Sequence, residues 1–176
     1  MTLASYVTLS RVVLIVPIIF LINNSEVFWA LALFILAGLT DYLDGFIARK
    51  TKTETSLGAL LDLLADKLLV CLVLLWCANF IYSYPVMIAA YVIIARELII
   101  SSMRQFLVEK IGENPIKVTY VAKSKTTIQM IAISFLILNP EMGYYFSLIS
   151  ILFIWIAAFI SIYSLFNYFK TYKHHF

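Results

Sequence analysis

Four aspartates in two short stretches carry the clearest chemistry in this sequence. Asp41 and Asp44 lie three residues apart, and Asp62 and Asp66 lie four residues apart. In a helix, either spacing puts both carboxylates on one face. Like charges on a shared face repel, so a cation is needed among them, and all-oxygen ligands favour hard divalent ions such as Mg2+ or Mn2+. The pattern therefore predicts a metal site whose four carboxylates could bridge two ions.

The residues around the aspartates suit a phosphate-bearing ligand. Gly45, Ala48 and Gly58 are small, which lets two helices approach closely or lets a ligand reach the backbone. Arg49 presents a planar fork that matches phosphate oxygens, although an arginine here could also be an ordinary membrane-surface anchor. Together with a carboxylate-bound metal, these residues indicate a diphosphate site.

The order Asp-x2-Asp-Gly-x2-Ala-Arg-x8-Gly-x3-Asp-x3-Asp resembles, without a gap or a substitution, the signature of the CDP-alcohol phosphotransferases. The resemblance implies a six-helix membrane enzyme, usually a homodimer, that moves a substituted phosphoryl group from a CDP-alcohol to an acceptor hydroxyl and releases CMP. It implies that Asp66, besides binding metal, is the general base, a role that spacing alone does not separate from that of a ligand. It also implies that the CDP-alcohol binds at Gly45, Ala48, Arg49 and Gly58.

Four further stretches resemble the bacterial branch of this family that uses CDP-diacylglycerol and glycerol 3-phosphate: residues 11–15, 65–70, 94–101 and 123–130. On this resemblance, the phosphate of the acceptor binds at Arg104, Lys123 and Lys125. The alternative for these three cations is contact with anionic lipid. The chain departs from the branch pattern at three places, without loss of a charged group: Ser5-Tyr6 replaces Pro-Asn, Leu63 replaces a proline and Ala122 replaces a glycine.

The composition predicts an integral membrane protein. Hydrophobic residues make up 63% of the 176 residues and charged residues 13%, against about 45–50% and 25% in ordinary globular domains. The length fits one domain, residues 1–176. Cys71 and Cys77 lie in an apolar run and are interpreted as packing residues. Nothing in the sequence indicates a nucleic-acid partner, and the start of the chain lacks the basic and small-residue pattern of a removable signal peptide.

The apolar runs predict an all-α fold with six transmembrane helices. A short interfacial segment, residues 1–11, precedes the first span, and a polar turn at 139–143 separates the last two. The expected spans are approximately 12–22, 27–43, 57–81, 85–106, 118–138 and 144–169.

The distribution of cations predicts the orientation of these spans. The connections 23–26, 79–84 and 139–143 contain no Lys or Arg, whereas the opposite connections and both ends of the chain are basic. The positive-inside rule then puts both termini in the cytoplasm. The aspartates face the cytoplasmic side of an inner membrane, where a soluble phosphorylated acceptor is available.

Some residues and functions stay open at this stage. Lys67 is expected to have a structural role, because a helix turns it about 100° away from Asp66. Arg96 and Glu97, inside the fourth span, could form an internal salt bridge or touch substrate. Another acceptor, such as the phosphatidylglycerol of cardiolipin synthases or an inositol phosphate, is the main alternative within the family. Outside it, a divalent-cation carrier or an inactive scaffold is possible, although acids at one membrane face rather than the midplane argue against a carrier.

Overall fold

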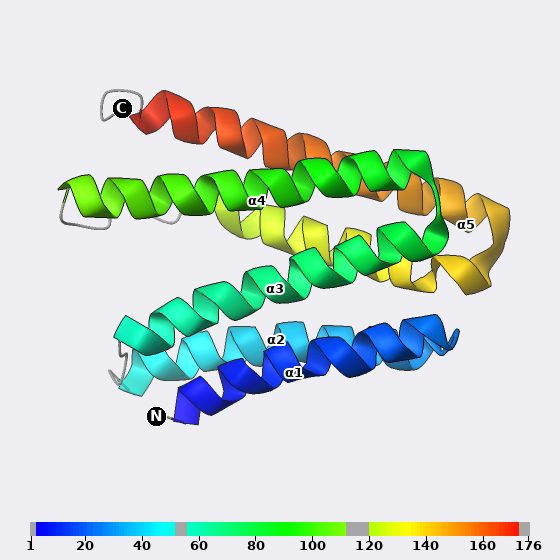
Figure 1. Cartoon of the computed structure of the whole chain (residues 1–176), viewed down its shortest axis with the longest axis horizontal. Helices are drawn as coiled ribbons and strands as arrows, with labels where there is room; N and C mark the ends of the chain where they lie inside the picture. Colours follow the sequence, from blue (N-terminus) through cyan, green and yellow to red (C-terminus); the bar gives the residue numbers. More distant parts are fainter. Residues whose placement is uncertain (1–2, 52–55, 112–119, 173–176) are drawn as a thin grey trace.

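Long apolar runs give long helices, and the computed structural model of the chain is an elongated helical bundle (Figure 1). The structure describes the backbone of residues 3–51, 56–111 and 120–172, and the side chains of residues 9–40, 61, 64–108, 110 and 125–171. The described backbone is all-helical, without a strand. Its helices are α1 (Leu3–Asn23), α2 (Val27–Thr51), α3 (Ser56–Ile81), α4 (Tyr84–Ile111) and α5 (Tyr120–Tyr172).

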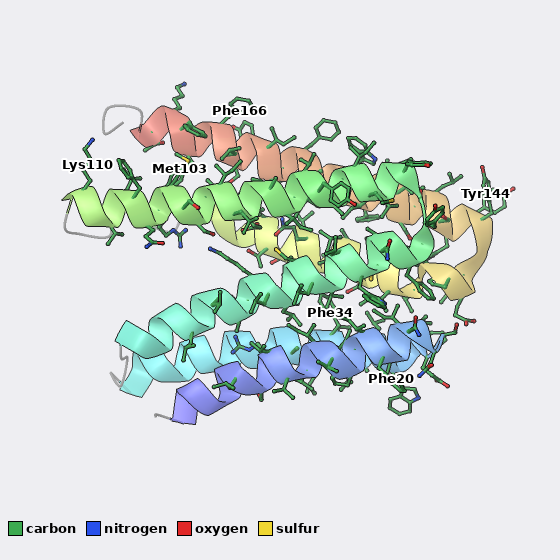
Figure 2. The ribbon with its side chains drawn as sticks, viewed as in Figure 1. Phe20, Phe34, Met103, Lys110, Tyr144 and Phe166 are labelled. Atoms are coloured by element: carbon green, nitrogen blue, oxygen red, sulfur yellow. The ribbon has the colours of Figure 1, made fainter. Side chains whose placement is uncertain are left out.

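The outer surface of the bundle is apolar. Phe20 and Phe166 are 65% and 68% exposed and point away from the bundle, whereas Phe34 is fully buried between helices (Figure 2). Within the described residues, three segments are long and apolar enough to cross a membrane: Leu64–Ile81, Tyr84–Val108 and Lys125–Thr171. So large an exposed apolar surface would be unfavourable in water. The chain is a multi-pass membrane protein.

The helix α5 folds back on itself at Gly143. A straight helix of its 53 residues would be about 80 Å long, far more than a bilayer core. Gly143 has φ 76° and ψ −178°, a conformation essentially restricted to glycine. Sequence analysis predicted a turn of five residues at 139–143, but the backbone stays helical through Met142 and this one residue reverses the chain (Figure 1).

Two other helices extend further than the apolar runs indicated. α1 begins at Leu3, so the described part of the expected interfacial segment is continuous with the first apolar run. α2 continues past Leu43 to Thr51, which places Asp41 and Asp44 inside the helix instead of at its end. Both extensions are less hydrophobic than the apolar runs next to them, so hydropathy alone did not predict them. Neither extension contains a proline, and the helix can therefore continue through both.

α3 lies at the centre of the bundle and packs against α1, α4 and α5. The start of α1 and the end of α5 lie at the left end of Figure 1, together with the end of α2 and the start of α3. The α1–α2 turn, the α3–α4 turn and the fold-back within α5 lie at the opposite end. At the α1–α2 turn, Ser25 has φ 63° and the amide of Glu26 donates to the carbonyl oxygen of Leu21 over 2.9 Å, a Schellman helix end.

Candidate active site

A cavity of about 210 Å³ lies among α2, α3, α4 and α5. Its charged lining consists of two acids and four bases, so the local balance is positive and suits an anionic ligand. These residues are Asp66 and Lys67 on α3, Arg96, Glu97 and Arg104 on α4, and Lys125 on α5. Ionisable groups within apolar helices are costly and usually functional. The cavity is therefore the candidate active site.

Asp66 presents its carboxylate to the cavity while a buried arginine holds one of its oxygens. Arg11 Nη1 donates to Asp66 Oδ1 over 3.3 Å. The Arg11 side chain is fully buried, whereas that of Asp66 is 43% exposed. The expectation that Arg11 ends an interfacial segment is wrong, because it lies within α1 and faces α3. A buried guanidinium needs an anionic partner, and this contact orients the Asp66 carboxylate.

Arg104 lines the cavity and carries an unsatisfied donor. Its Nε is buried and has no hydrogen-bond partner among the described residues. Such a donor costs free energy unless a ligand accepts from it. Lys67 lines the same cavity and donates to Ser101 Oγ on α4. This contact fits the structural role expected for Lys67, but the position of Lys67 beside the cavity was not expected.

Arg96 is committed to protein groups through all three of its side-chain nitrogens. Nη1 donates to Glu97 Oε1 over 3.1 Å, and Nη2 donates to Ser164 Oγ over 2.7 Å. Nε donates to the carbonyl oxygen of Ser161 over 3.2 Å. These contacts tie α4 to the second half of α5, and they favour the internal salt bridge over substrate contact for Arg96.

Glu97 connects this anchor to the first half of α5. Its Oε1 also accepts from Lys125 Nζ and, over 3.4 Å, from Gln129 Nε2. Gln129 Nε2 donates in addition to Ser161 Oγ over 3.0 Å. Lys125 and Gln129 are buried, at 5% and 3% exposure. One carboxylate oxygen thus joins three donors from two helices beside the cavity.

The structure brings three of the predicted site residues, Asp66, Arg104 and Lys125, to one cavity. The side chains of the others lie outside the described residues, although their backbone belongs to helices. These are Asp41, Asp44, Gly45, Ala48 and Arg49 in α2, Gly58 and Asp62 in α3, and Lys123 in α5. Because only residues 52–55 separate α2 from α3, the facing ends of these helices are at most about 18 Å apart.

The predicted metal site can be judged by its donors. Among the described side chains, no three His, Cys, Asp or Glu residues cluster as a metal site. Of the four predicted ligands, only Asp66 is within that set, and its partly exposed carboxylate faces the cavity. A donor set composed of carboxylates alone fits hard divalent ions.

Sequence reasoning missed the contributions of Arg11 and Gln129. Both are buried polar residues in apolar helices, and that rarity was the available signal. Their partners, however, lie far away in the chain, since Arg11 and Asp66 are 55 residues apart and Gln129 and Glu97 are 32 apart. Only the packing of the helices identifies these pairs.

The family model and the curated proteins that match this chain point to the same family. The family model for CDP-alcohol phosphatidyltransferase matches residues 1–163. Curated proteins named CDP-diacylglycerol--glycerol-3-phosphate 3-phosphatidyltransferase are similar over nearly the full length. The protein from Rickettsia bellii is 39% identical, with 99% of this chain and 97% of the relative covered. Those from Sodalis glossinidius and Escherichia coli are each 35% identical, with 99% and 92% of this chain and 96% and 89% of the relative covered.

Proposed function

The chain belongs to the CDP-alcohol phosphatidyltransferase family, and from this membership we propose that it transfers the phosphatidyl group of CDP-diacylglycerol to glycerol 3-phosphate. The products are phosphatidylglycerophosphate and CMP. Relatives that carry this activity in their names match the chain almost from end to end. The protein is an enzyme of anionic phospholipid synthesis.

The observation that carries the choice of acceptor is the cationic cavity beside Asp66. A phosphomonoester needs charged donors, and Arg104 and Lys125 line the cavity with the Arg104 Nε still unpartnered among the described residues. Lys123, close to Lys125 in the sequence, is the third proposed ligand of this phosphate. A wholly neutral acceptor alcohol would not need this set of cations.

The chemistry is proposed to centre on Asp66. Its carboxylate takes the proton from the primary hydroxyl of glycerol 3-phosphate, and the freed oxygen attacks the phosphorus that bears diacylglycerol. The new phosphorus–oxygen bond forms as the bond to the phosphate of CMP breaks, and CMP leaves. Arg11 keeps the Asp66 carboxylate in place during this step, because it holds Oδ1 from the buried side.

The family generally uses divalent metals, and the proposed ligands are Asp41, Asp44, Asp62 and Asp66. Two Mg2+ or Mn2+ ions bound there would neutralise the diphosphate and the leaving phosphate. The CDP-alcohol itself is proposed to lie against Gly45, Ala48, Arg49 and Gly58, with its acyl chains remaining in the bilayer.

We further propose six spans in the inner membrane, both termini in the cytoplasm, a single domain and a homodimer. Gly143 divides α5 into two helical halves, which brings the number of helical segments in the described backbone to six. The connections without Lys or Arg lie at the end of the bundle opposite the start of α1 (Figure 1). The positive-inside rule supports a cytoplasmic location for the other end, where the predicted metal ligands lie.

Two other functions remain as outcomes of a test. A cardiolipin synthase or a phosphatidylinositol-phosphate synthase would keep the metal site and change the acceptor. A divalent-cation carrier would need no acceptor. The basic cavity beside Asp66 argues against the carrier, because a carrier for cations gains nothing from four cationic side chains beside its site. The choice among phosphorylated acceptors rests on the names of the relatives.

The test is transfer of radiolabel in detergent–lipid micelles. CDP-diacylglycerol and Mg2+ or Mn2+ are supplied with glycerol 3-phosphate, phosphatidylglycerol or inositol phosphate, in wild type and in Asp66→Asn. We expect metal-dependent CMP release with glycerol 3-phosphate, abolished by Asp66→Asn. If only another acceptor supported turnover, the proposed acceptor would be wrong and the metal site would stand. If folded protein released no CMP with any acceptor, the proposed function would be contradicted.

A further inference from the structure

Glu97 lies at the meeting point of the buried polar groups on α4 and α5. Its Oε1 accepts from Arg96 Nη1, from Lys125 Nζ and from Gln129 Nε2. The side chains of Glu97 and Lys125 are only 12% and 6% exposed. Glu97 and Lys125 nevertheless both line the cavity. A carboxylate inside an anion-binding cavity opposes the anion, so it needs a compensating role.

The compensating role follows from the nature of Lys125. A lysine carries its charge on a flexible stem of four carbons and can move out of an apolar wall unless something holds it. Burial of a charge without a partner costs several kcal/mol. The contact with Glu97 removes that penalty and fixes the ammonium group at the wall between α4 and α5. An ammonium has three donors, so two remain for a ligand.

Glu97 is itself held firmly. Arg96 contacts it from the side and is anchored to α5 by Ser161 and Ser164. Because Arg96 Nη1 and Gln129 Nε2 both reach the oxygen that receives Lys125, this carboxylate has little freedom to swing. The network therefore acts as a fixed support under the Lys125 ammonium.

We propose that Glu97 is a positioning residue for the acceptor: it holds the Lys125 ammonium at the cavity wall so that the phosphate of the acceptor binds between Lys125 and Arg104. This inference rests on the proposed function, because it takes the cavity as the site of glycerol 3-phosphate. Glu97 itself touches neither the phosphate nor the reacting atoms. Its effect should pass entirely through Lys125.

A double-mutant cycle on the purified full chain in micelles tests this dependence. Glu97→Gln, Lys125→Met and the double variant are compared with wild type, and Glu141→Gln removes the same charge at an exposed site outside the cavity. The measurements are kcat, the KM values for glycerol 3-phosphate and CDP-diacylglycerol, and inhibition by inorganic phosphate as a direct probe of phosphate binding. Thermal unfolding reports whether each variant is folded.

We expect Glu97→Gln to raise KM for glycerol 3-phosphate and Ki for inorganic phosphate about tenfold, with kcat and KM for CDP-diacylglycerol within about threefold of wild type. Lys125→Met should give at least as large a rise. The double variant should be no worse than Lys125→Met, since Glu97 has no task once Lys125 is gone. Glu141→Gln should match wild type.

Other results would overturn the inference. If Glu97→Gln lowers KM for glycerol 3-phosphate, the carboxylate competes with the phosphate. If the losses of the two single variants multiply in the double variant, Glu97 acts independently of Lys125. Should Glu97→Gln alone fail to fold, the comparison of Lys125→Met with the double variant, which lacks the unpaired lysine, decides the same question. An active wild type with either contrary pattern overturns this inference alone, whereas a wild type that releases no CMP with glycerol 3-phosphate overturns the proposed function and this inference with it.

Discussion

Two hollows at different places in the bundle show what distinguishes a site from a gap. The cavity beside Asp66 has a volume of about 210 Å³ and six charged lining residues. A second hollow, of about 330 Å³, lies among α1, α3 and α4 near the α3–α4 turn and has no charged residue in its lining. We call this space the outer hollow and the cavity beside Asp66 the inner cavity. Its walls include Leu72, Trp76 and Tyr91.

The two spaces differ in the contacts that their lining side chains make. In the outer hollow, all lining side chains except that of Asn79 are apolar or aromatic, and packing of this kind is not directional, so many shapes of apolar group could fill it. At the inner cavity, Asp66 is held by Arg11, and Lys125 is held by Glu97. Directional contacts fix charges in space, and fixed charges can select a ligand and stabilise a transition state. Variants at the two places should therefore differ in kind.

The largest effect is expected from Asp66→Asn. The amide preserves size but can neither take a proton nor offer a full charge to a metal, so kcat should fall about 10³-fold or more. Single-turnover CMP release measures it at a temperature where both proteins are folded, because the neutral amide weakens the contact with the buried Arg11 guanidinium and should lower the thermal unfolding temperature. If Asp66→Asn retained a tenth of the wild-type rate, Asp66 would not be the general base.

The next effect is expected from Arg104→Met. Loss of charge-assisted hydrogen bonds to the acceptor phosphate should raise KM for glycerol 3-phosphate by about 10- to 100-fold, with KM for CDP-diacylglycerol unchanged. Lys110→Met on the same helix is the matched control, because Lys110 is exposed and lies over the Phe106 ring at 5.6 Å. Equal effects of the two substitutions would mean that general surface charge, not the cavity, attracts the acceptor.

The sequence pointed to three of the six charged residues that line the inner cavity. The apolar runs predicted an all-helical membrane chain, and Asp66, Arg104 and Lys125 were chosen from residue type, spacing and resemblance. Residue spacing works within a helix because neighbours on one face are three or four residues apart. The metal ligands Asp41, Asp44 and Asp62 stay a prediction, since their side chains are outside the described set.

Contacts between helices could not be predicted in this way. Arg11 was expected to end an interfacial segment because it precedes an apolar run, yet its side chain is fully buried and contacts Asp66 on α3. Glu97 and Lys125 are 28 residues apart, and nothing local marks them as partners. Similarly, a cluster of turn-forming residues at 139–143 predicted a turn, whereas the helix continues through Pro140. The chain reverses at Gly143, whose backbone has a positive φ. A local sequence pattern shows which backbone conformations a segment prefers. Tertiary packing then determines which of these conformations the segment adopts and which side chains it contacts.

A smaller effect is expected from Gly38→Ala at the edge of the inner cavity. A Cβ at Gly38 would clash with the terminal methyl carbon of Met130, and both residues line the cavity. That methyl group ends a flexible side chain, so it should swing away, and the stability should change by less than about 1 kcal/mol. The displaced side chain narrows the cavity, and KM for glycerol 3-phosphate should rise about threefold. Gly38→Ala combined with Met130→Val should restore it; a loss that persists in the double variant would place the effect elsewhere.

The smallest effect on catalysis is expected from Trp76→Leu in the outer hollow. Trp76 is 36% exposed and is one of several apolar groups there, so its truncation should cost about 1 kcal/mol of stability and leave kcat and both KM values within about twofold of wild type. Trp29→Leu, at a 68% exposed position on α2 outside both hollows, is the matched control. A rise of tenfold or more in KM for CDP-diacylglycerol with Trp76→Leu, absent from Trp29→Leu, would mean that the outer hollow takes part in lipid binding. The contrast between a charged site and an apolar gap would then have to be abandoned, because an acyl chain needs no fixed charge to be recognised.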